Sequence, residues 1–323
     1  MDMVSNLIKN NKDNKMNNVI DNIVPNLNDV TDLVLADNIE DHTQPVINNL
    51  GGKLDPFVEI HKQPTFLPSG KQSGAFSVTL GESEKEVGIV KENYLLVENK
   101  QISEIGQNIM SESGIDFQPD KVFFNGKQFR EIYVAKDAGL EVEVPKVGDL
   151  LGLVFEIQNS YDSSIKAGVN VYFQRLVCEN GMLSKAFGFG HTFWHTMNNV
   201  NWDNEISRAT QVLRNQSGGR LRSFAEACGK LQKPIETQDI ANIRENYISK
   251  LPTQQFGQMY DKYLADKDYS AWGLLNAGTN VLWHADKLTT ANFNNNSLVV
   301  DGLLDYGKVL TPETSDPNQI SFA

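Results

Sequence analysis

Two histidines four residues apart, His191 and His195 in the segment HTFWH, are the first candidates for chemistry. On a helix this spacing places both imidazoles on one face, which a zinc ion can use. A zincin-type protease would need Glu directly after the first histidine, and Thr192 occupies that position. Since no nearby Cys or carboxylate completes a site, the sequence favours an aromatic cluster here and predicts no metal site.

A second candidate is the polar segment Asn159, Ser160 and Asp162, with Arg175 as an electrophilic partner across a hairpin. These residue types also bond their own backbone and stabilise turns, so an Asx-type turn is the competing interpretation. Tyr161 lies within the segment, and a histidine, the side chain that titrates near neutrality, is absent from it. The sequence leaves the turn and the polar site both open and favours the turn.

The two cysteines, Cys178 and Cys228, are fifty residues apart and match neither a disulfide framework nor a zinc spacing. Cys178 ends an apolar run with no His or Asn partner nearby, which indicates a buried thiol rather than a nucleophile. The glycines of KAFGFGH lack the Lys-Ser/Thr ending of a phosphate loop. We therefore predict no catalytic residue and no cofactor, and enzymatic activity is not expected.

The strongest local feature is a basic segment in an acidic chain. The 323 residues carry a formal charge of −12, which argues against general phosphate binding, yet residues 208 to 233 hold six cations and only one carboxylate, Glu226. Such a segment can follow a phosphate backbone. Glu226 lies four residues from both Arg222 and Lys230, so a solvated face with ion pairs is the alternative. With one further cation on a strand, the predicted nucleic-acid-binding residues are Arg175, Arg208, Arg214, Arg220, Arg222, Lys230 and Lys233.

Aromatic residues lie just before this basic segment, and exposed rings there could stack unpaired bases. We expect most of them to be core and one or two to be free. The candidates are Tyr172, Phe187, Phe189, Phe193 and Trp194.

The elements that must position these residues change type along the chain. From about Ala75 to Cys178 short apolar runs alternate in strand fashion, and Asn125-Gly126 between two of them predicts a two-residue hairpin loop. One helix, with Ile102, Ile105 and Ile109 at helical spacing, ends at Gly114 between the strands. The strand-like runs are 75–80, 86–90, 94–97, 121–124, 128–134, 150–158 and 167–178.

After Asn201 the apolar period becomes helical. Two helices separated at Ser217-Gly218-Gly219 are expected, then helices from Thr237, Thr253 and Ser270, and a strand or coil beyond about Asn292. Strands followed by helices indicate an α+β fold, a mostly antiparallel sheet with one packed helix and a C-terminal helical region. The predicted divisions are a flexible or weakly helical Asn-rich arm (1–55), a sheet region (56–200), a helical region packed on the sheet (201–291) and a tail (292–323).

The segment NSYDSSIKAGVNVYFQRLVCENGM resembles the core of an uncharacterised phage/plasmid-like protein family, whose pattern is Asn-Ser-His-Asp-Gly-Ser, a strand, then Arg-hydrophobic-Val-Cys-x-Asn-Gly. Tyr161 and Ser163 depart from it, standing where the family usually has His and often has Gly. Three further segments are similar to the family in the same order: VGIVKENYLLVENKQ, FFNGKQFREIYV and YSAWGLLNAGTNVLWHADK. The family-motif residues are Asn159, Ser160, Asp162, Arg175, Cys178, Asn180 and Gly181.

This resemblance implies a setting beside mobile-element DNA metabolism and no settled activity. The sequence thus favours a phage or mobile-element protein that binds single-stranded DNA as a homo-oligomer, in an annealing or recombination-accessory role. A protein-interaction or structural module is the alternative, and a hydrolase centred on Asp162 and His195 is a third. No apolar stretch approaches the ~20 residues of a membrane span and no secretory signal is evident, so we expect a cytoplasmic protein without membrane partners.

Overall fold

The computed structural model describes residues 54–81, 85–177, 179–193, 201–285 and 289–310. The predicted arm lies almost wholly outside these residues. The described residues form two antiparallel sheets, one of three strands in the order β1-β2-β3 and one in the order β10-β8-β7-β5-β4, with β6 paired to β7 and β9 to β8. The strands are β1 (Ile60–Phe66), β2 (Gln72–Leu80), β3 (Glu86–Lys91), β4 (Phe117–Phe124), β5 (Gln128–Ala135), β6 (Val142–Glu143), β7 (Leu150–Ser160), β8 (Gly168–Arg175), β9 (Asn180–Met182) and β10 (Phe189–Thr192).

The β4–β5 hairpin predicted from Asn125-Gly126 is confirmed, and Gly126 has a φ of +86°. The backbone N–H of Asn125 donates to the carbonyl of Gln128 at 3.3 Å, which encloses Gly126 and Lys127. The two loop residues are therefore shifted by one from the prediction. Only the first has a positive φ, as in a type II′ turn, and the Asn125 side chain accepts from the backbone N–H groups of Lys127 and Gln128.

Helix α5 (Asn99–Ser113) ends at Gly114 in the left-handed conformation, as predicted. Its buried stripe includes Ile102, Ile105 and Ile109. A Cβ atom at Gly106 would lie 2.2 Å from the side chain of Ile157 on β7, so only glycine permits this close approach of helix and strand. Helix α5 thereby covers one face of the large sheet.

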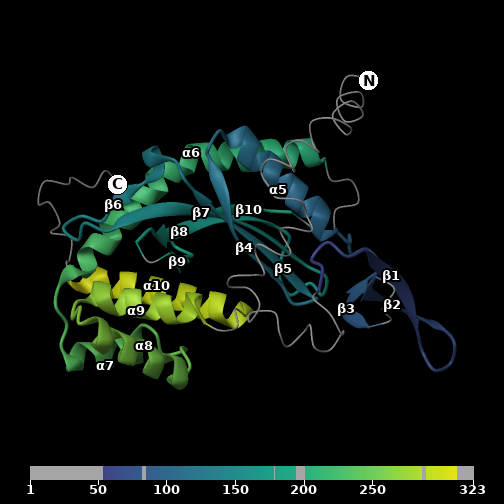
Figure 1. Ribbon diagram of the computed structural model, residues 1–323. Coiled ribbons are helices and arrows are strands. Elements are labelled where there is room, and N and C mark those ends of the chain that lie inside the picture. Colours follow the sequence, from purple (N-terminus) through teal and green to yellow (C-terminus); the bar gives the residue numbers. More distant parts are fainter. Residues whose placement is uncertain (1–53, 82–84, 178, 194–200, 286–288, 311–323) are drawn as a thin grey trace, which may run out of the picture. The chain divides into compact units, whose positions relative to one another are not determined.

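The predicted break at Ser217-Gly218-Gly219 is wrong, because α6 runs without interruption from Trp202 to Gly229. Leu213, Ser217 and Leu221 form one buried stripe on both sides of the glycines, and the Ser217 hydroxyl donates to the carbonyl of Leu213. Continuous burial on the sheet outweighs the roughly 1 kcal/mol that each interior glycine costs. Figure 1 shows α5 and α6 on the same side of the large sheet.

The opposite face of this sheet is covered by the C-terminal helices α9 (Ala271–Trp283) and α10 (Thr290–Leu310) (Figure 1). The expectation of strand or coil beyond Asn292 is therefore wrong for residues 292–310, and residues 311–323 lie outside the described ranges. The asparagines of α10, which disfavour a helix in isolation, make long-range bonds: Asn296 donates to the carbonyl of Gly181 at 2.9 Å and accepts from the N–H of Leu183 at 3.0 Å. Tertiary bonds to β9 and its flank thus stabilise a segment with weak helix propensity.

Helices α7 (Thr237–Asn246), α8 (Thr253–Asp266) and α9 begin where the sequence predicts them. The predicted strand at 94–97 is absent, because its backbone carbonyls bond side chains instead of a neighbouring strand. Lys62 Nζ donates to the carbonyl of Tyr94 at 2.8 Å, and Asn159 Nδ2 donates to the carbonyl of Val97 at 2.8 Å.

Antiparallel sheets followed by helices confirm the predicted α+β class. The main core lies between the large sheet and its helices, and a smaller cluster around Tyr172, Trp283 and Phe293 lies on the face opposite α6. Of the helices within the described ranges, none combines the length and the apolar character needed to cross a membrane.

Candidate functional site

The first family-motif residues join β7 to the segment that leads into α5. Asn159 is fully buried and its Nδ2 also donates to Asn99 Oδ1 at 3.0 Å. The Ser160 hydroxyl donates to the carbonyl of Ile165 at 2.6 Å, and Asp162 Oδ1 accepts from the N–H of Ser164 at 3.0 Å. These are the bonds of a turn, so the geometry supports the structural interpretation of this segment.

The remaining motif residues lie around β9 and the end of β8. Asn180 Oδ1 accepts from Asn280 Nδ2 at 3.1 Å and contacts His284 Nε2 at 3.0 Å, which attaches α9 to β9. A Cβ on Gly181 would lie 2.7 Å from the ring of Trp283, so glycine lets the indole pack on the strand. The motif residue Cys178 lies outside the described residues. Asn180 and Gly181 therefore hold helices on the sheet.

Arg175 and Asp162 do not form the catalytic pair considered from the sequence. The β7–β8 register pairs Arg175 with Leu151 at one end of the hairpin, whereas Asp162 lies in the turn at the other end. The guanidinium of Arg175 instead donates to Asp149 Oδ1 at 2.8 Å, and the other carboxylate oxygen accepts from Trp272 Nε1 at 2.9 Å. Through Asp149, Arg175 on β8 is connected to Trp272 on α9, and its guanidinium pairs with a carboxylate.

His191 lies on strand β10 rather than on a helix, and its partner in the proposed spacing, His195, lies outside the described residues. His191 Nε2 contacts Glu205 Oε2 at 2.6 Å, which connects β10 to the first turn of α6. Across the residues that the structure describes, no three His, Cys, Asp or Glu side chains form a group that could hold a metal ion. Cys228 is buried, and burial raises the pKa of its thiol, which makes it a poor nucleophile.

Arg208 and Arg222 project from the outer face of α6. They are four turns apart on the side opposite the buried stripe, and both are exposed. Arg208 contacts Glu205 at 3.2 Å, while Arg222 makes no hydrogen bond or ion pair within the described part of the chain. Glu226, in the same part, forms no ion pair with Arg222. The ion-paired surface expected as the alternative is therefore not formed at this position.

The other predicted cations lie away from this outer face. Arg214 donates to the carbonyls of Glu112 and Ser113 at the C-terminal end of α5, where a positive charge interacts favourably with the helix dipole. Lys233 donates to the carbonyl of Leu310 at the end of α10, and Lys230 is half-buried at the end of α6. Arg220, on the opposite flank of α6 from Arg214, is exposed and donates to the carbonyl of Ala186 at 3.3 Å. We call Arg208 and Arg222 on the outer side of α6, together with the exposed Arg220 on one flank, the basic face of α6.

The aromatic residues named as stacking candidates do not form an exposed platform. Tyr172 and Phe193 are buried, and Phe187 and Phe189 pack partly buried against the core. Trp194 lies outside the described residues. The packing of the four described rings does not support the prediction that one or two of the five are free for stacking.

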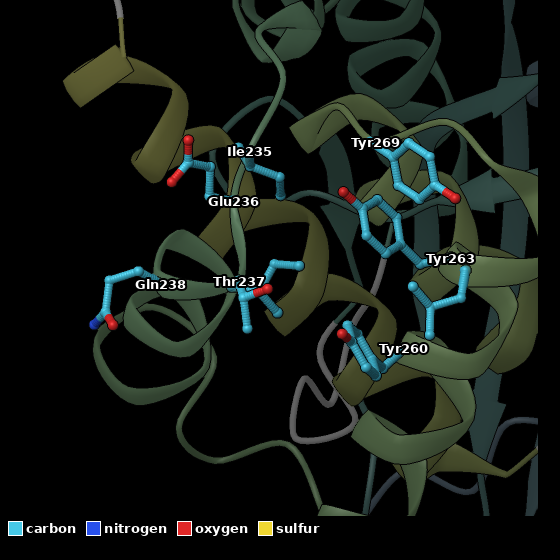
Figure 2. A pocket seen from close by; sticks show the side chains of 9 residues that line it. Ile235, Glu236, Thr237, Gln238, Tyr260, Tyr263 and Tyr269 are labelled. Atoms are coloured by element: carbon cyan, nitrogen blue, oxygen red, sulfur yellow. The ribbon is translucent and has the colours of Figure 1, made fainter.

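A row of tyrosines that the sequence reasoning did not single out lines a cavity of about 480 Å³ after α6. Figure 2 shows the rings of Tyr260, Tyr263 and Tyr269 on one side and the side chains of Glu236 and Gln238 on the other. Tyr260 and Tyr263 stack at 6.3 Å, and Tyr263 meets Tyr269 edge-on at 5.9 Å. Tyr269 is 54% exposed. In the sequence, Tyr263 follows Tyr260 by three residues and Tyr269 follows Tyr263 by six, but packing in the core explains such a spacing equally well.

No family model, curated protein or solved structure matches this chain.

Proposed function

We propose that the chain binds single-stranded nucleic acid along the outer face of α6. The observation that carries the proposal is a set of three exposed arginines on a 28-residue helix whose inner side is buried, with Arg208 and Arg222 on the outer side and Arg220 on one flank. A helix of this length extends about 42 Å. Fixed cations along a rigid rod suit a phosphate backbone, and they lie in a chain of net charge −12, so the positive charge is local.

The tyrosine cavity provides the second part of this proposal. It begins at Ile235, six residues after α6 ends. It exposes Tyr269 and, on the other side of the buried Tyr263, part of the ring of Tyr260. Unpaired bases stack on such rings at about 1–3 kcal/mol each, irrespective of sequence. Duplex DNA does not present its base faces, so this arrangement favours single strands. An annealing or recombination-accessory role in a mobile element, exercised as a homo-oligomer, is the biological setting that we propose.

The test is a titration of a fluorescent oligonucleotide, single-stranded or duplex, at several salt concentrations. The variant Arg208→Gln/Arg220→Gln/Arg222→Gln should weaken single-strand binding and flatten its salt dependence. Each lost phosphate contact removes about 0.7 from the slope of log affinity against log salt, so three contacts lower the slope by about 2. Light scattering with and without oligonucleotide measures the oligomeric state.

The matched control, Lys71→Gln/Lys100→Gln/Lys250→Gln, removes the same charge from exposed positions outside α6. It should keep most of the wild-type slope. The proposal is wrong if the wild type binds no oligonucleotide at low salt, or if both triple variants change the slope equally. Circular dichroism on the same samples checks that the fold survives.

A protein-interaction module is the second candidate, and the exposed side chains of Leu264 and Tyr269 at the tyrosine cavity favour it. Exposed large apolar groups beside a cavity are typical of protein-binding surfaces. Tyr269→Ala distinguishes the two candidates. It should lower oligonucleotide affinity if the ring stacks a base, and it should leave that affinity unchanged if the cavity binds a protein.

A further inference from the structure

A second cavity, of about 340 Å³, lies at the face of the large sheet that is turned away from α6. Its wall includes Asp120 of β4, Val134 of β5 and Gln174 of β8. The neighbour of Gln174, Phe173, stacks on Phe224 of α6 at 4.2 Å, so Gln174 points to the opposite face. This site is therefore separate from the basic face of α6.

Two buried hydrogen-bond acceptors at this cavity have no donor among the described residues. Gln174 is 3% exposed, and its Oε1 accepts no hydrogen bond there. Asp120 lies within the register shift between Pro119 and Lys121, and its Oδ2 likewise accepts none. The nearest cation to that oxygen, Lys121 Nζ, is 3.9 Å away and lies 5.1 Å from the centre of the Trp283 ring. Buried acceptors without donors are costly, so their presence at a cavity points to a ligand that donates.

The charges around the cavity narrow the chemistry of that ligand. Glu141 and Glu179 also line it, so three carboxylates outnumber the lining cation Lys136 and the adjacent Lys121. This excess of negative charge opposes phosphates and carboxylates and favours a cation. The volume is within the range of small-molecule sites, and buried Val134 with Leu176 offers apolar contact for a short aliphatic chain.

We propose that this cavity binds a small organic cation, whose guanidinium or primary ammonium group donates hydrogen bonds to Asp120 and Gln174. The aliphatic part of the ligand then lies against Val134 and Leu176. A planar guanidinium, with several donors in a fixed fork, suits a carboxylate beside an amide oxygen better than an ammonium does.

The protonation of Asp120 makes binding depend on pH. Burial raises the pKa of this carboxyl above its ordinary value, and nearby charges modify the shift. Lys121, His284 and Lys136 lower the pKa and Glu179 raises it, and the charge of Asp120 in turn raises the pKa of the buried Tyr172. A cation binds the ionised form, so affinity should fall as pH drops through the raised pKa, and a proton should be released on binding at pH values near it.

Isothermal titration calorimetry with N-acetyl-L-arginine amide, its lysine counterpart and its citrulline counterpart tests the proposal. Citrulline keeps the shape and most donors of arginine without the charge. The arginine compound should bind more tightly than the lysine compound and at least about tenfold more tightly than the citrulline compound. Equal binding of all three, or binding of none, would overturn the proposal.

Two variants locate the site. Asp120→Asn should lower arginine-amide affinity about ten- to a hundredfold, and Gln174→Met should lower it several-fold. Asp261→Asn, at an exposed position on α8, is the control and should change nothing. The Arg208/Arg220/Arg222 variant should also bind the amide normally, which separates this site from the proposed nucleic-acid face.

Stability measurements on the same variants exclude a merely structural role. Because burial disfavours the ionised Asp120, Asp120→Asn should not lower the free energy of unfolding at neutral pH. If Asp120→Asn does not fold, the affinity of Gln174→Met for the arginine amide tests the site instead, provided that this variant has a normal unfolding curve. Unchanged affinity in a folded variant of either residue rules out this site.

Discussion

The hydroxyl of Ser103 on α5 donates a hydrogen bond of 2.7 Å to the carboxylate of Glu131 on β5, inside the main interface between helix and sheet. Both side chains are buried, and the hydroxyl of Tyr133 lies 3.5 Å from the same carboxylate oxygen. Burial outweighs these two donors and raises the pKa of Glu131 to about 7. A titratable group thus lies where α5 packs on the sheet.

Glu131 should make the protein less stable as the pH rises. Below about pH 4.5 the carboxyl is protonated in both states, and between about 4.5 and 7 it ionises in the unfolded chain first, which favours unfolding. Glu131→Gln removes this dependence. Relative to wild type, the variant should gain on the order of 3 kcal/mol between pH 4 and pH 8, measured by urea unfolding. A difference that does not change with pH would contradict the raised pKa.

The buried ion pair between Arg130 and Glu156 should be costly to break from one side. The two side chains are 7% and 2% exposed, and Asn170 Nδ2 also donates to Glu156 at 3.0 Å. Glu156→Leu leaves the guanidinium without its carboxylate and should lower the free energy of unfolding by about 3–5 kcal/mol. Arg130→Met/Glu156→Leu should recover much of that loss, because no single charge stays buried. Chemical unfolding of the two single variants and the double variant measures the coupling free energy between the two side chains. If the losses of the single variants add up in the double variant, the prediction is wrong.

Gly126→Val should destabilise the β4–β5 hairpin by about 1–2 kcal/mol, because a β-branched residue is strained at a φ of +86°. Gly257→Val is the control, since Gly257 lies within α8 with open space around its Cα and without a positive φ. Thermal unfolding should show a loss for the first variant and none for the second. An equal change in stability for the two variants would show that Gly126 does not occupy the strained turn position.

Gly219→Ala should stabilise the protein by about 0.5–1 kcal/mol, because α6 is continuous at Gly219 and a Cβ atom there meets nothing within 4 Å. The same substitution at Gly106 of α5 should destabilise, since the Cβ would meet Ile157 at 2.2 Å. Changes of opposite sign in the free energy of unfolding, measured by guanidinium titration, would support both the continuous helix at Gly219 and the close contact at Gly106. A loss at Gly219 would indicate that the helix bends there.

Local patterns predicted the parts of the fold that depend on local physics. Gly114 ends α5 and Gly126 turns the hairpin because each conformation is set by a few neighbouring residues. Helix α10 was missed because asparagines such as Asn296 are poor helix formers, and the partners of Asn296 on β9 and its flank lie more than a hundred residues away in the chain. Such long-range bonds leave no mark in the local sequence.

The candidate site shows the same division. Six cations in a short segment were evident from the sequence, but their distribution over the molecule was not. Arg214 and Lys233 bond carbonyls at the ends of α5 and α10, partners that no spacing within the segment reveals. Gln174 and Asp120 were missed for a related reason, because their lack of donors is a property of the packed sheet.

Trp283 and Phe293 cover the face of the large sheet that is turned away from α6, and this arrangement matters while the chain is being synthesised. Both residues lie far beyond the end of β8 in the chain, so β4, β5, β7 and β8 leave the ribosome before their cover does. At about 5–20 residues per second, the nascent sheet keeps this face open for roughly 6–24 s. Arg130, Glu156 and Asn170 lie on it, and these polar groups can hold water there until the two aromatic rings arrive. A face that carries these polar groups is less prone to association than a wholly apolar one, whereas in the finished protein the same ion pair has to be buried at a cost in desolvation.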